Sequence, residues 1–406
     1  MADSVIQLKC NCNNYPWGRT GRQSLAARLC EKTNPDFKID ESKPYSEMWM
    51  GTYPELPTYS LETGEDLQQI LNKNKEKLIG KKVLDKFGAD LPFLPKVLSI
   101  AKALPLQIHP DKELSEKLHK EDPEKYTDPN HKPEIAVALS RFEAFIGFKP
   151  VAEIENLLQL DSLKQFVPAT ASALQLDDET LRQVCANMLK ASEDAVASAL
   201  KGLRSTSPEQ LGNQRYILDL IPRLEEQYGR EDNGNLVALV CMNYAVLEPG
   251  SALYIPADGI HAYLSGDIVE CMARSNNVIN TGFCPKPDRD SADLFTKALT
   301  FKQHDPREPM LEKKASDKSV NGKTFEFTPP MSEFNMFVTN LAASESESIK
   351  PVYGPSVMFA TSGHGKMTVE GKSFTLDEGY VYFIGQGVGV DITAADGLAV
   401  YRAYAE

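Results

Sequence analysis

Two histidines, a glutamate and a glutamine are the residues of this chain whose types and spacing best fit a metal site. Gln107 and His109 stand two positions apart, so on a strand both side chains point to one face. Glu134 opens the alternating run 135–139, and His261 follows the apolar strand pattern at 252–255. Two imidazoles and a carboxylate, with the Gln107 amide oxygen as a weaker fourth ligand, suit Zn²⁺ and leave room for water or substrate. Fe²⁺ or Mn²⁺ would fit these donors nearly as well, and the spacing does not decide between them.

The length and composition of the chain favour a globular protein of two or three domains. It has 406 residues, of which 42% are hydrophobic and 25% charged. A net charge of −13 repels nucleic-acid phosphates, so we expect no nucleic-acid partner. The sequence has no apolar run of about 20 residues, so we expect no membrane partner. The first residues do not resemble a secretory signal and the seven cysteines are scattered, which predicts a cytoplasmic location.

The hydrophobic pattern that must position these side chains changes twice along the chain. Between 150 and 234, apolar residues recur at helical spacing, as in Ile154, Leu157 and Leu158, and predict a helical insertion. Short apolar runs separated by Gly, Ser and Asn turns fill the rest and predict strands. The fold class is therefore mainly β with a helical insertion. We divide the chain into a discontinuous catalytic part (1–149 and 235–303), the insertion (150–234) and a C-terminal part (304–406).

A weak internal repeat relates the two β-rich parts. Residues 247–255 align without gaps with residues 376–384, and a Gly turn enters a strand of bulky residues in both. The pattern indicates two related jelly rolls. The same alignment puts Val390 opposite His261, and His364 has no acidic or histidine neighbour at ligand spacing. We therefore predict a C-terminal jelly roll without a metal site.

Eight segments of the chain resemble the type I phosphomannose isomerases, also called mannose-6-phosphate isomerases. The segments occur in family order and cover about residues 10–290: Tyr15–Gly18, Lys43–Gly51, Pro92–Leu98, Gln107–Lys112, Asn130–Glu134, Phe142–Phe148, Ile255–Asp267 and Ile268–Ala273. The resemblance implies two cupin-like jelly rolls and an α-helical domain. It also implies one Zn²⁺ per chain on Gln107, His109, Glu134 and His261. The implied partner is a small sugar phosphate, and we favour a monomer.

The reaction that the resemblance implies is the interconversion of mannose 6-phosphate and fructose 6-phosphate through a cis-enediol, which supplies mannose for GDP-mannose and for glycoconjugate and cell-wall synthesis. Such an isomerase needs an electrophile for the charge on two sugar oxygens and a base that moves a proton between C2 and C1. Glu270 is our first candidate for the base and Lys132 the second. The resemblance implies further substrate-binding residues: Lys96 and Lys286 for the phosphate, Tyr263 and Asp267 as lining, and Trp17 and Glu47 as support.

Three positions depart from the family pattern. Asn280 stands where the family has an arginine held to be important in catalysis, Pro105 replaces a serine expected at the phosphate, and Tyr53 replaces a histidine. Loss of a positioned cation costs roughly 3–4 kcal/mol of transition-state stabilisation. The alternatives are therefore a slow or non-catalytic sugar-phosphate-binding relative, or an isomerase of a different sugar phosphate.

Overall fold

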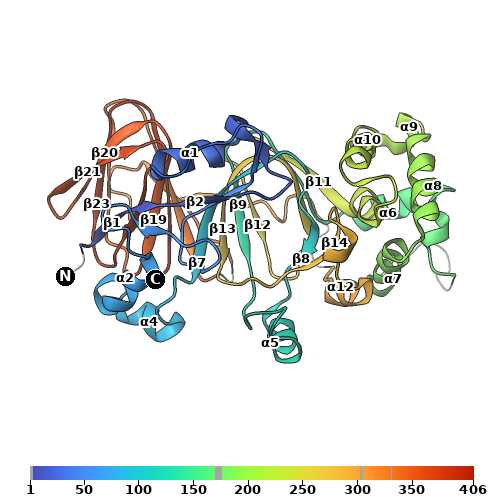
Figure 1. Cartoon of the computed structure of the whole chain (residues 1–406). Coiled ribbons are helices and arrows are strands. Elements are labelled where there is room, and N and C mark those ends of the chain that lie inside the picture. Colours follow the sequence, from blue (N-terminus) through green and yellow to red (C-terminus); the bar gives the residue numbers. More distant parts are fainter. Residues whose placement is uncertain (1–2, 170–175, 302–304, 331) are drawn as a thin grey trace.

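The protein is built of three parts side by side, as a computed structural model shows (Figure 1). The structure describes residues 3–169, 176–301, 305–330 and 332–406. A β-rich C-terminal part lies at one end, a large antiparallel sheet in the middle, and a group of helices at the other end. The predicted fold class, mainly β with a helical segment, is confirmed.

The middle part is a ten-stranded antiparallel sheet that curls around an apolar interior. Its main path runs in the order β11 (Met242–Leu247), β10 (Phe142–Phe148), β13 (His261–Ala273), β7 (Phe93–Ile100), β5 (Glu47–Trp49) and β2 (Asn11–Asn13). Four shorter strands branch from it: β9 (Glu134–Ala138) pairs with β12 (Ala252–Ile255) and β13, and β8 (Leu106–Ile108) pairs with β14 (Ile279–Gly282) and β13. The interior is filled by residues from many of these strands, among them Ile100, Ala136, Phe142, Ile146, Leu253, Tyr263 and Ile268.

Strand β13 changes its side-chain alternation at Gly266. Before Gly266, Tyr263 faces the interior of the barrel that the curled middle sheet forms, while Ala262 and Leu264 pack toward the helices of the insertion. Beyond it, Ile268 faces the interior although an odd number of positions separates it from Tyr263. Gly266 has φ +121°, and an added Cβ would lie 2.7 Å from the Arg141 carbonyl oxygen, so this bend requires glycine. The bend returns the second half of β13 to the inner face.

The C-terminal part is a jelly roll of two antiparallel sheets around its own core. The larger has the order β15 (Lys314–Ala315), β16 (Thr324–Phe327), β17 (Asn335–Leu341), β24 (Leu398–Tyr404), β19 (Ser356–Ser362), β22 (Val381–Ile384), β1 (Val5–Lys9) and β6 (Tyr59–Ser60). The smaller has the order β18 (Ser346–Ile349), β23 (Val390–Ala394), β20 (His364–Val369) and β21 (Lys372–Asp377). Residues such as Met358, Tyr382, Met367 and Ile392 fill the space between them.

The two jelly rolls pack against each other through alternate residues of shared strands. On β22, Tyr382 belongs to the C-terminal core, whereas Val381 and Phe383 pack toward the middle sheet with Val97 and Val269. The first strand of the chain, β1, pairs with β22 in this C-terminal sheet. The sequence-based boundaries assign residues 1–149, which include β1 and β6, to the catalytic jelly roll. In the structure both strands belong to the larger sheet of the C-terminal jelly roll.

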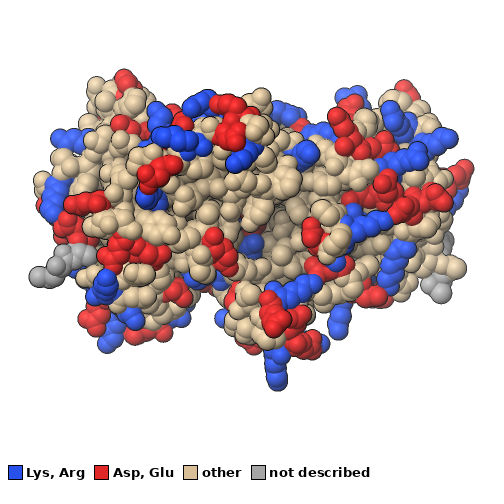
Figure 2. Space-filling view, viewed as in Figure 1, with Lys and Arg blue, Asp and Glu red and all other residues tan. Residues whose placement is uncertain are grey.

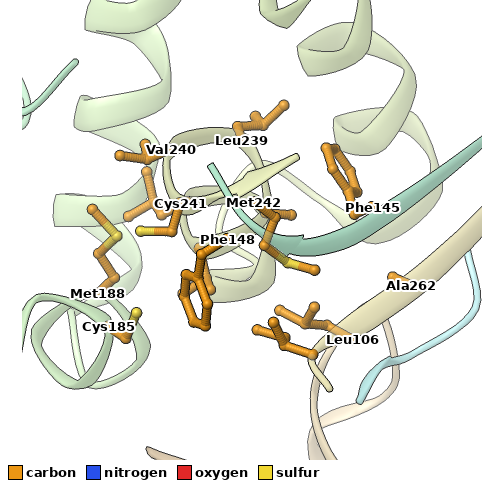
Figure 3. Close-up of a cluster of buried hydrophobic side chains, with 14 of the residues drawn as sticks. Leu106, Phe145, Phe148, Cys185, Met188, Leu239, Val240, Cys241, Met242 and Ala262 are labelled. Atoms are coloured by element: carbon orange, nitrogen blue, oxygen red, sulfur yellow. The ribbon is translucent and has the colours of Figure 1, made fainter. Parts of the chain in front are cut away.

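The helical insertion covers the outer face of β10 and β13. Figure 3 shows Phe148 of β10 beside Cys185 and Met188 of helix α7, with Phe145 of β10 and Ala262 of β13 on the far side of the same cluster. The helices are α6 (Val151–Leu158), η2 (Lys164–Phe166), α7 (Asp178–Leu189), α8 (Glu193–Arg204), α9 (Pro208–Leu211), η3 (Gly212–Gln214), α10 (Ile217–Tyr228), α11 (Asn233–Leu236) and the π-helix η4 (Val237–Cys241). Helical structure thus continues to Cys241, beyond the predicted end at 234. The reason is that the fully apolar run 236–242 fits a buried helix as well as a buried strand.

The remaining elements are short and lie around the two jelly rolls. They are η1 (Gly21–Gln23), α1 (Leu25–Thr33), α2 (Leu67–Lys73), α3 (Lys75–Leu78), α4 (Lys81–Phe87), α5 (Lys112–Glu121), η5 (Lys286–Asp288), α12 (Ala292–Ala298) and the hairpin β3 (Arg19–Thr20) with β4 (Pro44–Tyr45). Among the described residues, none of the helices has the length and apolarity needed to cross a membrane.

Candidate metal centre and active site

His109, Glu134 and His261 meet at one point inside the catalytic jelly roll. His109 follows β8, Glu134 begins β9 and His261 begins β13. Nε2 of His109 lies 3.3 Å from one carboxylate oxygen of Glu134, and Nε2 of His261 lies 3.7 Å from the other. One donor atom from each residue lies within 4.8 Å of the others, and all three side chains are buried. This is the geometry of three ligands around one ion.

Two backbone carbonyls orient the histidines so that their Nε2 atoms are free for a metal. Nδ1 of His109 donates to the carbonyl of Asn277 (2.9 Å), and Nδ1 of His261 donates to that of Gly259 (2.9 Å). Both Nε2 atoms are buried and have no hydrogen-bond partner among the described residues. Burial, with the neighbouring His109, lowers the pKa of His261 to about 4, so its imidazole is neutral. Neutral rings fixed by carbonyl acceptors and aimed at a carboxylate are what a divalent metal ion requires.

Gln107 lies directly beside this cluster. Across β8 and β13 its Cα is the register partner of His261, and across β8 and β14 it is the partner of Asn280. Directly opposed residues of antiparallel strands point to the same face. Asn280, Gln107 and His261 therefore form a row on one face of three adjacent strands, and the Asn280 Oδ1 atom is buried without a partner in the described part of the chain.

A second buried cluster, of one lysine and two glutamates, lies further along β13. Nζ of Lys96 lies 3.0 Å from Glu270 and 3.7 Å from Glu47, and all three side chains are less than a tenth exposed. Trp49 fixes Glu47 through a hydrogen bond from its indole nitrogen to Oε2 (2.6 Å). Burial raises the pKa of Glu270 to about 7, although Lys96 opposes the shift. A carboxylate with a pKa near neutrality is suited to accept and return a proton.

Lys132 and Tyr263 present polar atoms to the ligand cluster. Nζ of Lys132 lies 3.4 Å from the Glu134 carboxylate, with 13% of its side chain exposed. The ring of Tyr263 lies 5.7 Å from that of His261 and 5.2 Å from that of Phe142. Its hydroxyl is buried and forms no hydrogen bond within the described ranges, which leaves it available to a ligand.

A cavity of about 740 Å³ opens beside the strand that carries Gln107, next to its cross-strand partner Asn280. Its lining includes four positions that the sequence singled out: Trp17, Pro105, Asn280 and Lys286. Tyr15 stacks on Trp17 at its edge, with ring centroids 5.9 Å apart. Lys286 is two-thirds exposed and forms an ion pair with Glu193.

Four of the six predicted substrate-binding residues do not line this cavity: Glu47, Lys96, Tyr263 and Asp267. Asp267 accepts a hydrogen bond from Ser99 (2.7 Å) and pairs with Arg19 (3.1 Å), which is a link between strands. Lys96 is held in the glutamate cluster and does not line the cavity.

The C-terminal jelly roll differs from the catalytic one at the equivalent positions. Val390 begins β23 as His261 begins β13, in agreement with the repeat. His364, however, does have an acidic neighbour: its Nδ1 lies 3.1 Å from Asp377 across β20 and β21. The sequence did not reveal this pairing because strand register brings the two residues together. The contact is an exposed pair and lacks a third ligand among the described residues.

Several residues that shape the site gave no clear signal in the sequence. The carbonyls of Asn277 and Gly259 act through the backbone, so their side-chain types carry no information. Arg289 and Lys102 line the 740 Å³ cavity, but arginine and lysine in polar loops are usually solvated. Gly259, two positions before His261, is a residue type common in tight turns, and its amide donates to the Pro256 carbonyl in the turn that precedes His261.

The chain matches the family model described as phosphomannose isomerase type I, catalytic domain, over residues 5–151. The mannose-6-phosphate isomerase of Candida glabrata is 36% identical over 100% of this chain and 99% of its own length. The Saccharomyces cerevisiae enzyme of the same name is 35% identical, and the alignment covers both chains completely. Among solved structures, mannose 6-phosphate isomerase from Salmonella typhimurium, bound to its substrate fructose 6-phosphate and zinc, superposes with a TM-score of 0.83 at 27% identity over both whole chains.

Two jelly rolls, one of which encloses a His–Glu–His cluster, define a cupin-type metalloprotein. The full-length relatives narrow this class. The chain belongs to the type I phosphomannose isomerase family.

Proposed function

We propose that this protein interconverts mannose 6-phosphate and fructose 6-phosphate with one zinc ion per chain. The observation that carries the proposal is the convergence of the two unpartnered Nε2 atoms of His109 and His261 on Glu134, in a chain whose full-length relatives are mannose-6-phosphate isomerases. Gln107, beside His261, is the fourth ligand. A bound zinc ion would supply the electrophile for negative charge on the two sugar oxygens.

Glu270 is the proton carrier of the proposed reaction. It takes the proton from C2 of the open-chain aldose, and the C–H electron pair becomes the C1–C2 double bond of the enediol while O1 gains a proton. Glu270 then returns the proton that it carries to C1, and loss of the O2 proton gives the ketose. The raised pKa of Glu270, about 7, favours both steps at neutral pH.

Lys96 and Lys132 act on carboxylates in this scheme. Lys96 keeps Glu270 and Glu47 in place, which is a positioning role rather than the phosphate contact implied by the family resemblance. Lys132 reaches the Glu134 carboxylate and is near enough to the cluster to donate a proton to a sugar oxygen. Tyr263 offers its unpartnered hydroxyl to the substrate.

A slow or non-catalytic sugar-phosphate binder is the second candidate. Asn280 and Pro105, which both line the cavity beside Gln107, favour it because Asn280 lacks the charge of the family arginine and Pro105 offers neither a hydroxyl nor an N–H. The intact ligand cluster and the raised pKa of Glu270 favour the isomerase.

Assay of the purified, zinc-loaded protein with mannose 6-phosphate separates the two candidates. In ²H₂O, an isomerase forms fructose 6-phosphate and incorporates solvent deuterium whenever the carried proton exchanges with water. The matched variant Glu270→Gln keeps the size and polarity of the side chain and should abolish both signals. Tight binding of mannose 6-phosphate without any product from either protein would establish the binder.

We further propose that the enzyme works as a monomer in the cytoplasm and supplies mannose for GDP-mannose synthesis. All seven cysteines are buried free thiols, which supports a reducing compartment. On the face shown in Figure 2, acidic and basic side chains are interspersed, which suits a small-molecule substrate better than a polyanion.

A further inference from the structure

The 740 Å³ cavity carries positive charge that the reaction scheme has not used. Three cationic residues line it together with Asn280: Lys102, Lys286 and Arg289. We propose that Arg289 is the residue that fixes the substrate's phosphate group in this cavity, a role that rests on the proposed function. It would thereby supply a cation on the wall where Asn280 and Pro105 offer none.

The backbone places Arg289 next to Asn280. The amide of Asp290 donates to the Asn280 carbonyl (2.8 Å), and the amide of Asn280 donates to the Asp290 carboxylate (2.8 Å). Asn280 is in turn the cross-strand partner of Gln107. Arg289 therefore stands along the chain segment that borders the metal-ligand row. A hexose phosphate whose C1 end faces the metal ligands could extend its phosphate toward this wall.

Contacts on one side of the guanidinium hold Arg289 in a fixed position. Nη2 donates to Asp232 (2.6 Å), and Nε and Nη2 donate to the Cys284 carbonyl (3.1 and 2.9 Å). Asp232 is itself buried and accepts hydrogen bonds from the amides of Gly234 and Phe283. Nη1 makes no hydrogen bond to any described residue. The side chain is 17% exposed, and its contacts to Asp232 and Cys284 hold this remaining donor in a fixed direction.

The other cations near the site are less suited to bind a dianion. Lys96 and Lys132 are paired with glutamates inside the barrel. Lys286 is 67% exposed and paired with Glu193, and Lys102 is an exposed lysine at the cavity edge. Glu231 and Asp288 also line the cavity and repel anions. Asp232 lines it too, but Arg289 matches its negative charge. The phosphate must therefore approach Arg289 closely to bind at all.

Binding of inorganic phosphate to the zinc-loaded full-length protein, measured by calorimetry, tests the proposal without any turnover. Arg289→Gln should weaken phosphate binding at least about tenfold, since a hydrogen bond to a charged group is lost. It should also raise KM for mannose 6-phosphate by a similar factor with little change in kcat, because the phosphate is remote from the reacting carbons. Arg289→Lys should retain part of the affinity. Arg307→Gln is the matched control, since Arg307 is 87% exposed and pairs with Asp305 alone among the described residues.

A double variant separates the ligand role from a structural one. Arg289→Gln leaves the Asp232 carboxylate buried without its partner, and this change alone could loosen the cavity. Asp232→Asn combined with Arg289→Gln removes that charge while keeping an oxygen acceptor for the two amides. The double variant should regain thermal stability and still bind phosphate weakly.

Phosphate affinity equal to that of the unchanged protein in the single or the double variant would overturn the proposal. Failure of the isomerase function gives a different result: the protein would not turn over mannose 6-phosphate, yet its phosphate binding would still depend on Arg289. Active enzyme with unchanged KM in Arg289→Gln would reject this inference and leave the isomerase function intact.

Discussion

Glu270 and Lys96 face each other across strands β13 and β7, with carboxylate and ammonium 3.0 Å apart in the barrel interior. Lys96 also lies near Glu47, so one buried cation serves two buried carboxylates. Burial disfavours two ionised carboxylates around a single cation, and Glu270 is the one whose pKa rises to about 7. The pair thus sets the protonation state of the proposed base.

Removal of Lys96 should move the pH dependence of turnover. Lys96→Met takes away the charge that stabilises ionised Glu270, so the acidic limb of kcat/KM should shift to higher pH by about one unit or more. The measurement is a pH profile of the zinc-loaded enzyme beside the surface control Lys164→Met. An unshifted limb would show that Lys96 does not control the ionisation of the base.

Metal content should depend on each histidine of the cluster. His109→Ala and His261→Ala each remove one of three buried ligands and should leave the purified protein with little zinc, whereas the exposed His364→Ala should keep one ion per chain. Elemental analysis after dialysis gives the stoichiometry. Full occupancy in both cluster variants would refute the ligand assignment.

An arginine at position 280 should raise the rate. Asn280 offers a neutral hydrogen bond, about half as strong as a charged one, and the adjoining cavity gives a longer side chain room. Asn280→Arg should therefore increase kcat more than it changes KM, because the charge develops mainly in the transition state. Asn280→Met adds length without charge and should not help. An unchanged or lower kcat for Asn280→Arg would mean that the pocket is adapted to asparagine.

Low pH should weaken the contact between Glu143 of β10 and Arg223 of the helical insertion. Burial opposes ionisation of this carboxylate, but hydrogen bonds from Ser265, Arg223, Tyr244 and Arg141 outweigh burial and lower the pKa of Glu143 to about 2. A pKa below its ordinary value near 4.5 contributes stability that is complete above about pH 4.5 and is lost as the pH falls toward 2.

Replacement of Glu143 by glutamine should accordingly cost about 2 kcal/mol at pH 7. The difference from the unchanged protein should shrink at pH 3, where the wild-type carboxylate begins to protonate. Urea unfolding at pH 7 and at pH 3 measures the difference in unfolding free energy between the variant and the unchanged protein, with the exposed Asp161→Asn as control. An equal difference at pH 7 and pH 3 would contradict the role of the ionised carboxylate.

The metal cluster could be predicted because its members sit at strand ends whose patterns are visible in the sequence. The spacing of two between Gln107 and His109, and the strand that begins at Glu134, both appear in the structure. Residue type alone put His261 in the candidate set, and the family resemblance made the set specific, since the sequence does not contain the register that sets β13 beside β8.

The position of Glu270 could not be derived from alternation alone. Nine positions separate it from His261, and on a regular strand the two side chains would point to opposite faces. The bend at Gly266 reverses the alternation and returns Glu270 to the interior. A single glycine in a strand signals a bulge, but its direction depends on the Arg141 backbone that it meets.

Strand β1 joins the two ends of the chain, since Val5 pairs with Ile384. During synthesis, residues 5–8 must wait for residues 381–384 before the backbone hydrogen bonds between β1 and β22 can form. This sheet therefore closes around β1 only after β22 has been made, and a fragment that stops at residue 303 would carry β1 with β6 on one edge and no partner on the other. The catalytic jelly roll, whose outer face packs against that sheet, thus reaches its final packing only after Val381 and Phe383 of β22 are in place.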